Sequence, residues 1–174
     1  MNKTVIIQGS SKSHGDTRTV IDYFNKDNQL DIIDLKTKNI GHFDYEFNNK
    51  SDDFIGLITN IIEKYDTIIF ATPVYWYSMS GMIKVFLDRF EDLRYNYKEL
   101  GRKLYSKNMA LISCNNANDL REGFSMPFIE TAKYLEMNYL GSAHAWVENG
   151  EIDPEAKVLI DQFRNKLKVK LVVH

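Results

Sequence analysis

Short apolar runs alternate with longer amphipathic stretches along most of this chain. Five runs are brief and rich in β-branched or aromatic residues, and they predict β-strands at residues 4–8, 30–35, 67–72, 108–114 and 139–146. The first, third and fourth are almost continuously apolar, which is typical of central strands in a parallel sheet covered on both faces. The second alternates more between apolar and polar positions, which suits an edge strand.

Apolar residues recur at helical spacing between these runs. In the clearest case Phe54, Ile58 and Ile61 fall on one stripe, as in a helix that packs against a sheet. Near the other end of the chain, Asp153 and Pro154 predict a capped helix start. The predicted helices span residues 16–25, 52–65, 80–90, 123–136 and 154–167.

The alternating order of strands and helices predicts the fold class. Five successive strand-helix units are typical of an α/β protein with an open, doubly wound sheet and helices on both faces. Residues 39–50, rich in Asn, Asp and aromatics, and residues 94–107, rich in Tyr and Lys, fall outside the alternation. No linker divides the chain, so we expect one domain over residues 1–174.

The charge of the chain argues against nucleic acid as a ligand. Lys and Arg number 22, Asp and Glu number 24, and both signs are scattered, so no basic surface is predicted. The N-terminal apolar run is too short for a signal peptide or a membrane span. With one cysteine, Cys114, and no cluster of metal ligands, we expect a cytoplasmic protein without a metal site or a membrane partner.

The first predicted strand runs into a turn of small and hydroxyl-bearing residues. Residues 9–17 read GSSKSHGDT, and ligands of open α/β sheets bind outside the carboxyl ends of the strands. The free N–H groups at the start of the following helix favour an anion, and a phosphate is the natural one. The spacing is neither a Walker loop nor GxGxxG. A serine-rich turn that binds nothing, capped by Asp16, is the structural alternative.

The third predicted strand ends in a proline and an aromatic loop. Residues 72–89 read TPVYWYSMSGMIKVFLDR, and Pro73 stops the strand because it cannot donate a ladder hydrogen bond. Tyr75, Trp76 and Tyr77 then crowd a loop where a planar ring could stack. Core packing or a dimer contact is the alternative, but the position opposite the predicted anion site favours a planar ligand.

The two motifs together resemble those of the flavodoxin-like NAD(P)H-dependent FMN reductases and quinone reductases. Residues 72–89 match the family signature TPVYW-x-x-x-SG-x-[LMI]K-x-[FW]-x-DR nearly in full, and the resemblance covers essentially the whole chain. It implies a flavodoxin-like five-stranded parallel sheet of order 2-1-3-4-5, noncovalent FMN at the strand ends, and a homodimer. It also implies an enzyme that passes two electrons from NAD(P)H through FMN to a quinone, free flavin, nitro or azo compound, or metal ion.

The resemblance assigns residues to the cofactor as well. No protein acid or base is expected to be essential for hydride transfer to the flavin, so no catalytic residue is assigned. Main-chain N–H groups of residues 74–76 and 115–116 are expected to stabilise the reduced ring, and Asp88 is expected to pair with Arg89. The implied FMN-binding residues are Ser10, Lys12, Ser13, Asp16 and Thr17 around the phosphate, Pro73, Val74, Tyr75 and Trp76 along the isoalloxazine, and Cys114, Asn115 and Asn116 at its other end.

Two other functions stay open, and Asp16 bears on the first of them. It stands where many relatives carry Asn, and its carboxylate repels a phosphate unless it caps the helix or pairs with Lys12 or Arg18. One alternative is a flavin-free binding or regulatory relative. The other is an electron-carrier flavodoxin without a nicotinamide substrate, but such carriers are commonly strongly acidic, whereas the formal net charge here is −2.

Overall fold

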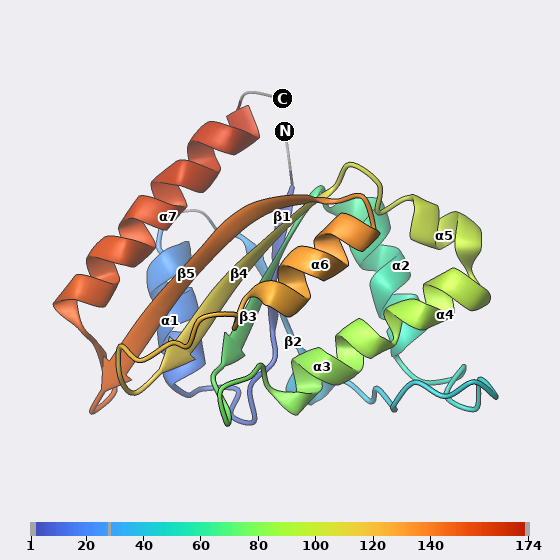
Figure 1. Cartoon of the computed structure of the whole chain (residues 1–174), viewed down its shortest axis with the longest axis horizontal. Coiled ribbons are helices and arrows are strands. Elements are labelled where there is room, and N and C mark those ends of the chain that lie inside the picture. The colour runs from blue at the N-terminus through green and yellow to red at the C-terminus, as the bar shows by residue number, and fades with distance from the viewer. Residues whose placement is uncertain (1–2, 28, 173–174) are drawn as a thin grey trace.

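The structure is a computed structural model of the chain and describes residues 3–27 and 29–172. Its six-stranded sheet has the order β2-β1-β3-β4-β5-β6, and the first five strands run parallel (Figure 1). The five predicted strands, their order 2-1-3-4-5 and the edge position of β2 are confirmed. The strands are β1 (Thr4–Gln8), β2 (Asp31–Asp34), β3 (Thr67–Pro73), β4 (Asn108–Asn115), β5 (Asn138–Glu148) and β6 (Glu151–Ile152).

Helices cover both faces of the sheet (Figure 1). One face carries α1 (Asp16–Asn25) and α7 (Pro154–Val172), and the other carries α2 (Phe54–Lys64), α3 (Gly81–Asp88) and α6 (Met126–Tyr134). Successive side chains of a strand point to opposite faces, so Ile6 of β1 packs in the core beside α1 and α7, whereas Ile7 packs in the core beside α2, α3 and α6. The two cores hold the carboxyl ends of the strands in fixed positions.

Local sequence explains where these helices begin and end. The stripe predicted on α2 is buried, with Phe54, Ile58 and Ile61 in the core. Ser80 caps α3, because its hydroxyl accepts a hydrogen bond from the N–H of Ile83 at 3.3 Å. At the start of α7 the Asp153 carboxylate accepts from the N–H of Glu155 at 2.8 Å, as its sequence predicts. No helix in the described ranges is long and apolar enough to cross a membrane.

Two parts of the fold differ from the prediction. The expected five-stranded sheet has a sixth, two-residue strand, β6, which pairs antiparallel with β5 across a turn at Asn149 and Gly150. The helix expected over residues 80–90 ends at Asp88, and two short helices follow it, α4 (Phe90–Tyr95) and α5 (Lys98–Arg102). Arg89 stands between α3 and α4, and its side chain is buried.

Arg89 ties the loop after β2 to this helical layer. Its side chain is 1% exposed and donates hydrogen bonds to Asp92, at 2.6 Å, and to Asp52. Two carboxylates compensate the buried cation, as burial of a charge requires. The pairing expected between Asp88 and Arg89 is therefore wrong: Asp88 pairs with Lys84 at 2.5 Å on the surface.

Candidate functional site

The serine-rich turn after β1 is held against the start of α3. The N–H of Gly9 donates to the carbonyl oxygen of Ala71 in β3 at 2.9 Å, and the Ser80 hydroxyl donates to the carbonyl oxygen of Gly9 at 2.6 Å. A Cβ atom at Gly9 would lie 2.3 Å from the side chain of buried Ile83. Glycine is therefore required here by the close approach of the helix to the strand end, and the turn starts from a fixed point.

A buried glutamine at the end of β1 forms hydrogen bonds to the same turn. Gln8, the last residue of β1, is fully buried, and its side-chain amide donates to the carbonyl oxygens of Ser13 at 3.0 Å and Lys12 at 3.4 Å. These two bonds hold the carbonyl groups of the turn against the end of the strand. The side-chain oxygen of Gln8 has no hydrogen-bond partner in the part of the chain that the structure describes.

Helix α1 begins without a side-chain cap. Gly15 occupies the N-cap position, so no side chain accepts the N–H groups of the first turn. Asp16 is exposed at the first helical position and makes no ion pair within the described ranges, while Arg18 pairs with Asp22 at 2.7 Å. Neither the cap nor the ion pair that would keep the Asp16 carboxylate from repelling a phosphate is present among these residues. Uncapped N–H groups beside the hydroxyls of the serine-rich turn fit an anionic phosphate.

The loop after β3 is a tight hairpin that displays two aromatic rings. Tyr75 and Ser78 exchange main-chain hydrogen bonds of 2.9 and 3.0 Å. Between them Trp76 and Tyr77 have φ of 48° and 65°, which is unfavourable for bulky side chains. Their side chains are 93% and 62% exposed. The chain therefore keeps two large apolar rings in water, in a strained turn, at the ligand-binding edge of the sheet.

The loop after β4 lies beside this hairpin. The N–H of Val74 donates to the carbonyl oxygen of Cys114 at 2.8 Å, and the Asn115 amide donates to Asp119 at 2.7 Å. A cavity of about 200 Å³ opens between the two loops and is lined by Val74, Trp76, Tyr77, Asn115, Asp119 and Arg121. The cavity lies where an aromatic ring held by the two loops would be placed.

Cys114 and His144 lie near this cavity but have little chemical reactivity. Burial raises the pKa of the Cys114 thiol to about 12, and the nearby Asp16 carboxylate acts in the same direction, so the thiol is protonated at neutral pH. Burial also lowers the pKa of His144. The His144 ring contacts the Ser113 hydroxyl at 2.9 Å and the Ala117 carbonyl oxygen at 3.3 Å.

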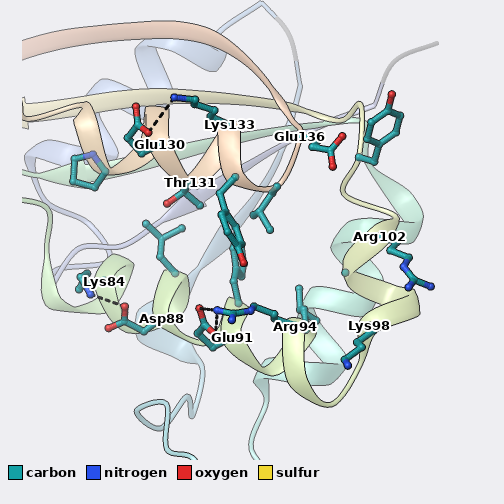
Figure 2. A pocket seen from close by; sticks show the side chains of 18 of the residues that line it. Lys84, Asp88, Glu91, Arg94, Lys98, Arg102, Glu130, Thr131, Lys133 and Glu136 are labelled. Atoms are coloured by element: carbon teal, nitrogen blue, oxygen red, sulfur yellow. Dashed lines mark hydrogen bonds and ion pairs between the residues drawn. The ribbon is translucent and has the colours of Figure 1, made fainter.

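A larger cavity, of about 1160 Å³, lies between α3, α4, α5 and α6 (Figure 2). Six of the nine charged side chains that line it form three ion pairs: Lys84 with Asp88, Arg94 with Glu91, and Lys133 with Glu130. None of the FMN-binding residues expected from the sequence lines it. The candidate site is therefore placed at the carboxyl ends of β1, β3 and β4, where the expected FMN-binding residues lie.

The structure brings the expected FMN-binding residues to one edge of the sheet. Three neighbouring strands end there, and the hydroxyls of Ser11 and Tyr75 meet across the first two loops. Tyr77, expected in the aromatic loop but not among the twelve FMN-binding residues, lines the small cavity as well. Gln8 and Arg121 also lie in this region and were not expected there, because neither the burial of Gln8 nor the cavity position of Arg121 leaves a local sequence pattern.

Most of the chain matches one known protein family. The family described as NADPH-dependent FMN reductase matches residues 2–152. The chain belongs to this family. Membership confirms the expected oxidoreductase class, the FMN cofactor and the NAD(P)H donor, and it favours a reductase over an electron-carrier flavodoxin or a flavin-free relative.

Individual relatives are distant but cover nearly the whole chain. The protein YwqN of Bacillus subtilis (strain 168), named as an NAD(P)H-dependent FMN-containing oxidoreductase, is 23% identical over 91% of this chain and 90% of its own. An NADPH azoreductase of Bacillus sp. (strain OY1-2) is 23% identical over 99% and 94%. The structure of general stress protein 14 of Treponema denticola in complex with FMN superposes with a TM-score of 0.63 at 19% identity over 99% of both chains. At this identity the superposition shows the fold.

Proposed function

We propose that the chain is a single-domain enzyme that binds FMN through the three loops after β1, β3 and β4. The observation that carries the proposal is the convergence of an uncapped helix start, a hydroxyl-rich turn and an aromatic hairpin on three neighbouring strand ends. The phosphate is assigned to the turn and to the start of α1, and the ring to the cavity between the other two loops. The binding residues are the twelve expected from the sequence. Asp16 is proposed to face the phosphate with its main-chain N–H, because its unpaired carboxylate would repel the anion.

The protein supplies position and polarity in this reaction. FMN, when bound, supplies the two-electron chemistry between NAD(P)H and a small acceptor. The N–H groups of Val74 and Tyr75 already donate to Cys114 and Ser78. The other main-chain donors proposed to face the ring are the N–H groups of Trp76, Asn115 and Asn116. Pro73 and Val74 limit the space beside the ring and exclude water, which strengthens such polar contacts.

We propose that the electron acceptor is a quinone, free flavin, nitro or azo compound, or metal ion, as the family resemblance implies. The exposed rings of Trp76 and Tyr77, beside the cavity assigned to the FMN ring, favour a flat aromatic acceptor, because ring stacking needs such a surface. We also propose a cytoplasmic homodimer. The exposed pair of Tyr45 and Tyr95, with ring centroids 6.3 Å apart, supports a subunit contact, and light scattering after size-exclusion chromatography tests it.

A spectroscopic titration tests the FMN site. The purified protein is expected to retain FMN after gel filtration and to show a visible flavin spectrum that NADH or NADPH bleaches under anaerobic conditions. Replacing Thr17, buried beside the uncapped helix start, with the isosteric Val is expected to weaken FMN binding about tenfold, since a hydrogen bond to a charged group is lost.

The control is Thr131→Val, because Thr131 lines the larger cavity between the helices (Figure 2). It is expected to bind FMN as tightly as the original protein. Equal FMN affinity in all three proteins, or no flavin binding by the original protein, would refute the placement of the phosphate.

A further inference from the structure

Arg121 differs from the other arginines of the chain. The sequence contains six arginines. Five form ion pairs with carboxylates: Arg18, Arg89, Arg94, Arg102 and Arg164. Arg121 is exposed and has no carboxylate partner within 4.0 Å in residues 3–27 and 29–172. An exposed guanidinium without an ion-pair partner is free to bind an anion.

The position of Arg121 directs it to the candidate site. Its guanidinium carbon lies 5.8 Å from the ring centroid of Tyr77, and both side chains line the cavity of about 200 Å³ beside Val74. The contact with the ring is a cation–π interaction, which limits the orientations of the guanidinium. Asp119 is the other charged residue of the cavity, and Asn115 holds its carboxylate through a hydrogen bond of 2.7 Å.

We propose that Arg121 makes the enzyme selective for flat aromatic acceptors that carry a carboxylate or sulfonate. The acceptor ring stacks near Trp76 and Tyr77, and the guanidinium donates paired hydrogen bonds to two oxygens of the anionic group. Asp119 on the same cavity disfavours an anion placed away from Arg121, so the charge also fixes the orientation of the acceptor. This inference rests on the proposed function, because it adds a specificity determinant to the same site.

A pair of nitroaromatic compounds of nearly equal shape tests the proposal. Binding of 4-nitrobenzoate and of neutral 4-nitrobenzamide is measured by the change in the flavin spectrum of the FMN-loaded protein, and by tryptophan fluorescence of the FMN-free protein. Arg121→Gln is expected to weaken 4-nitrobenzoate binding about fivefold to tenfold and to leave 4-nitrobenzamide binding unchanged. With NADH as donor, kcat/KM of Arg121→Gln is expected to fall about fivefold to tenfold for 4-nitrobenzoate. For 4-nitrobenzamide it is expected to stay unchanged.

The matched control is Arg102→Gln, which removes the same charge from an exposed arginine of α5. It is expected to leave both affinities unchanged. An equal loss for both compounds in Arg121→Gln, or no preference for 4-nitrobenzoate in the original protein, would overturn the proposal. A loss confined to NADPH oxidation, with NADH and both compounds unaffected, would overturn it in favour of the 2′-phosphate of the donor.

The experiment distinguishes a failure of the Arg121 proposal from a failure of the FMN proposal. A protein that binds FMN and oxidises NAD(P)H, but whose Arg121→Gln variant does not discriminate between the two compounds, refutes the role of Arg121 alone. A protein without a flavin spectrum refutes the FMN site. In that case the fluorescence titration of the FMN-free protein still decides whether Arg121 binds the carboxylate.

Discussion

The hydroxyl groups of Ser11 and Tyr75 lie 2.7 Å apart, although the two residues are 64 positions apart in the sequence. This hydrogen bond joins the serine-rich turn after β1 to the aromatic hairpin after β3, which are the two loops assigned to opposite ends of FMN. Because it is exposed, it contributes little to global stability. It instead fixes the distance between the two loops before the cofactor binds, which lowers the entropy lost on binding.

Tyr75→Phe tests this role, because it removes the hydroxyl and keeps the ring. We expect FMN binding to weaken about twofold to tenfold, from the loss of one hydrogen bond, with the free energy of unfolding changed by less than about 1 kcal/mol. Fluorescence titration with FMN and urea denaturation measure the two quantities. Tyr105→Phe, on another exposed tyrosine, is the control and should bind FMN normally. Unchanged FMN affinity in Tyr75→Phe would show that the loops need no such link.

The close contact between Gly9 and α3 predicts that alanine at Gly9 and alanine at Gly56 have opposite effects on stability. In Gly9→Ala the new methyl group meets the buried side chain of Ile83, so α3 must shift away from β1. We expect a loss of about 1–3 kcal/mol in the free energy of unfolding, as for other overpacked sites. Gly56 lies in α2 with open space around it. Gly56→Ala is therefore expected to stabilise the protein by up to about 1 kcal/mol, because alanine favours the helix.

Urea denaturation of both glycine variants measures the changes. If Gly9→Ala were as stable as the original protein, the close approach of α3 to the strand end would be refuted. FMN affinity should fall in Gly9→Ala and stay constant in Gly56→Ala, because the turn after β1 moves only in the first.

The ion pair between Asp52 and Arg89 predicts a dependence of stability on pH. Burial tends to raise the pKa of Asp52, but hydrogen bonds from Arg89 and from the N–H groups of Phe54 and Gly41 outweigh it and lower the pKa below its ordinary value. A lowered pKa stabilises the folded state above the ordinary carboxyl range, and this contribution is lost as the pH falls through the folded-state pKa. The stability difference between the original protein and Asp52→Asn should therefore be constant near neutral pH and shrink below pH about 4.

At neutral pH we expect Asp52→Asn to cost about 1–3 kcal/mol, because buried Arg89 keeps only Asp92 as a charged partner. Urea denaturation between pH 3 and 7 gives the curve. The control is Asp22→Asn, which breaks an exposed pair with Arg18 and should cost less than about 1 kcal/mol at every pH. A difference for Asp52→Asn that grew as the pH fell would contradict the assigned direction of the pKa.

The sequence predicts the framework of this fold because its strands and helices carry strong local patterns. Burial is indicated directly by the apolar runs of β1, β3 and β4 and by the apolar stripe of α2. Strand β6 was missed, although Asn149 and Gly150 form a turn signal that a two-residue strand can follow. The break at Arg89 was missed for another reason: its buried partner Asp52 lies 37 positions away, and no local pattern reports a pairing at that distance.

The candidate site likewise combines features that have a local sequence pattern with features that have none. The serine-rich turn and the aromatic loop follow strands of recognisable sequence, so their place at one edge of the sheet could be predicted. The stacking of Arg121 on Tyr77 joins two loops 44 positions apart, and it depends on the register of β3 beside β4. The positive φ of Trp76 and Tyr77 was also invisible, because bulky aromatics in a sequence do not indicate such a turn.

The strain in this aromatic hairpin gives the last prediction, because the chain contains a relaxed turn for comparison. The turn between β5 and β6 has positive φ at both central residues and carries Asn149 and Gly150, the pair that favours this geometry. The hairpin after β3 has the same two positive φ angles but carries Trp76 and Tyr77. Replacing these two by Asn and Gly should therefore relieve backbone strain and stabilise the FMN-free protein by about 1–3 kcal/mol.

The same double variant should lose function, because it removes the rings proposed to stack on a flat acceptor. We expect kcat/KM for a quinone such as menadione to fall about tenfold, as for the loss of about 1.4 kcal/mol of ring stacking, while the phosphate site proposed at the turn after β1 is unchanged. Urea denaturation, FMN titration and steady-state rates separate the three effects. The reverse change at the relaxed turn, Asn149→Trp with Gly150→Tyr, is the control and should destabilise the protein without affecting the rate constants of the folded fraction. A double variant of the aromatic hairpin that is less stable than the original protein would show that the two rings contribute more to folding than their backbone strain costs.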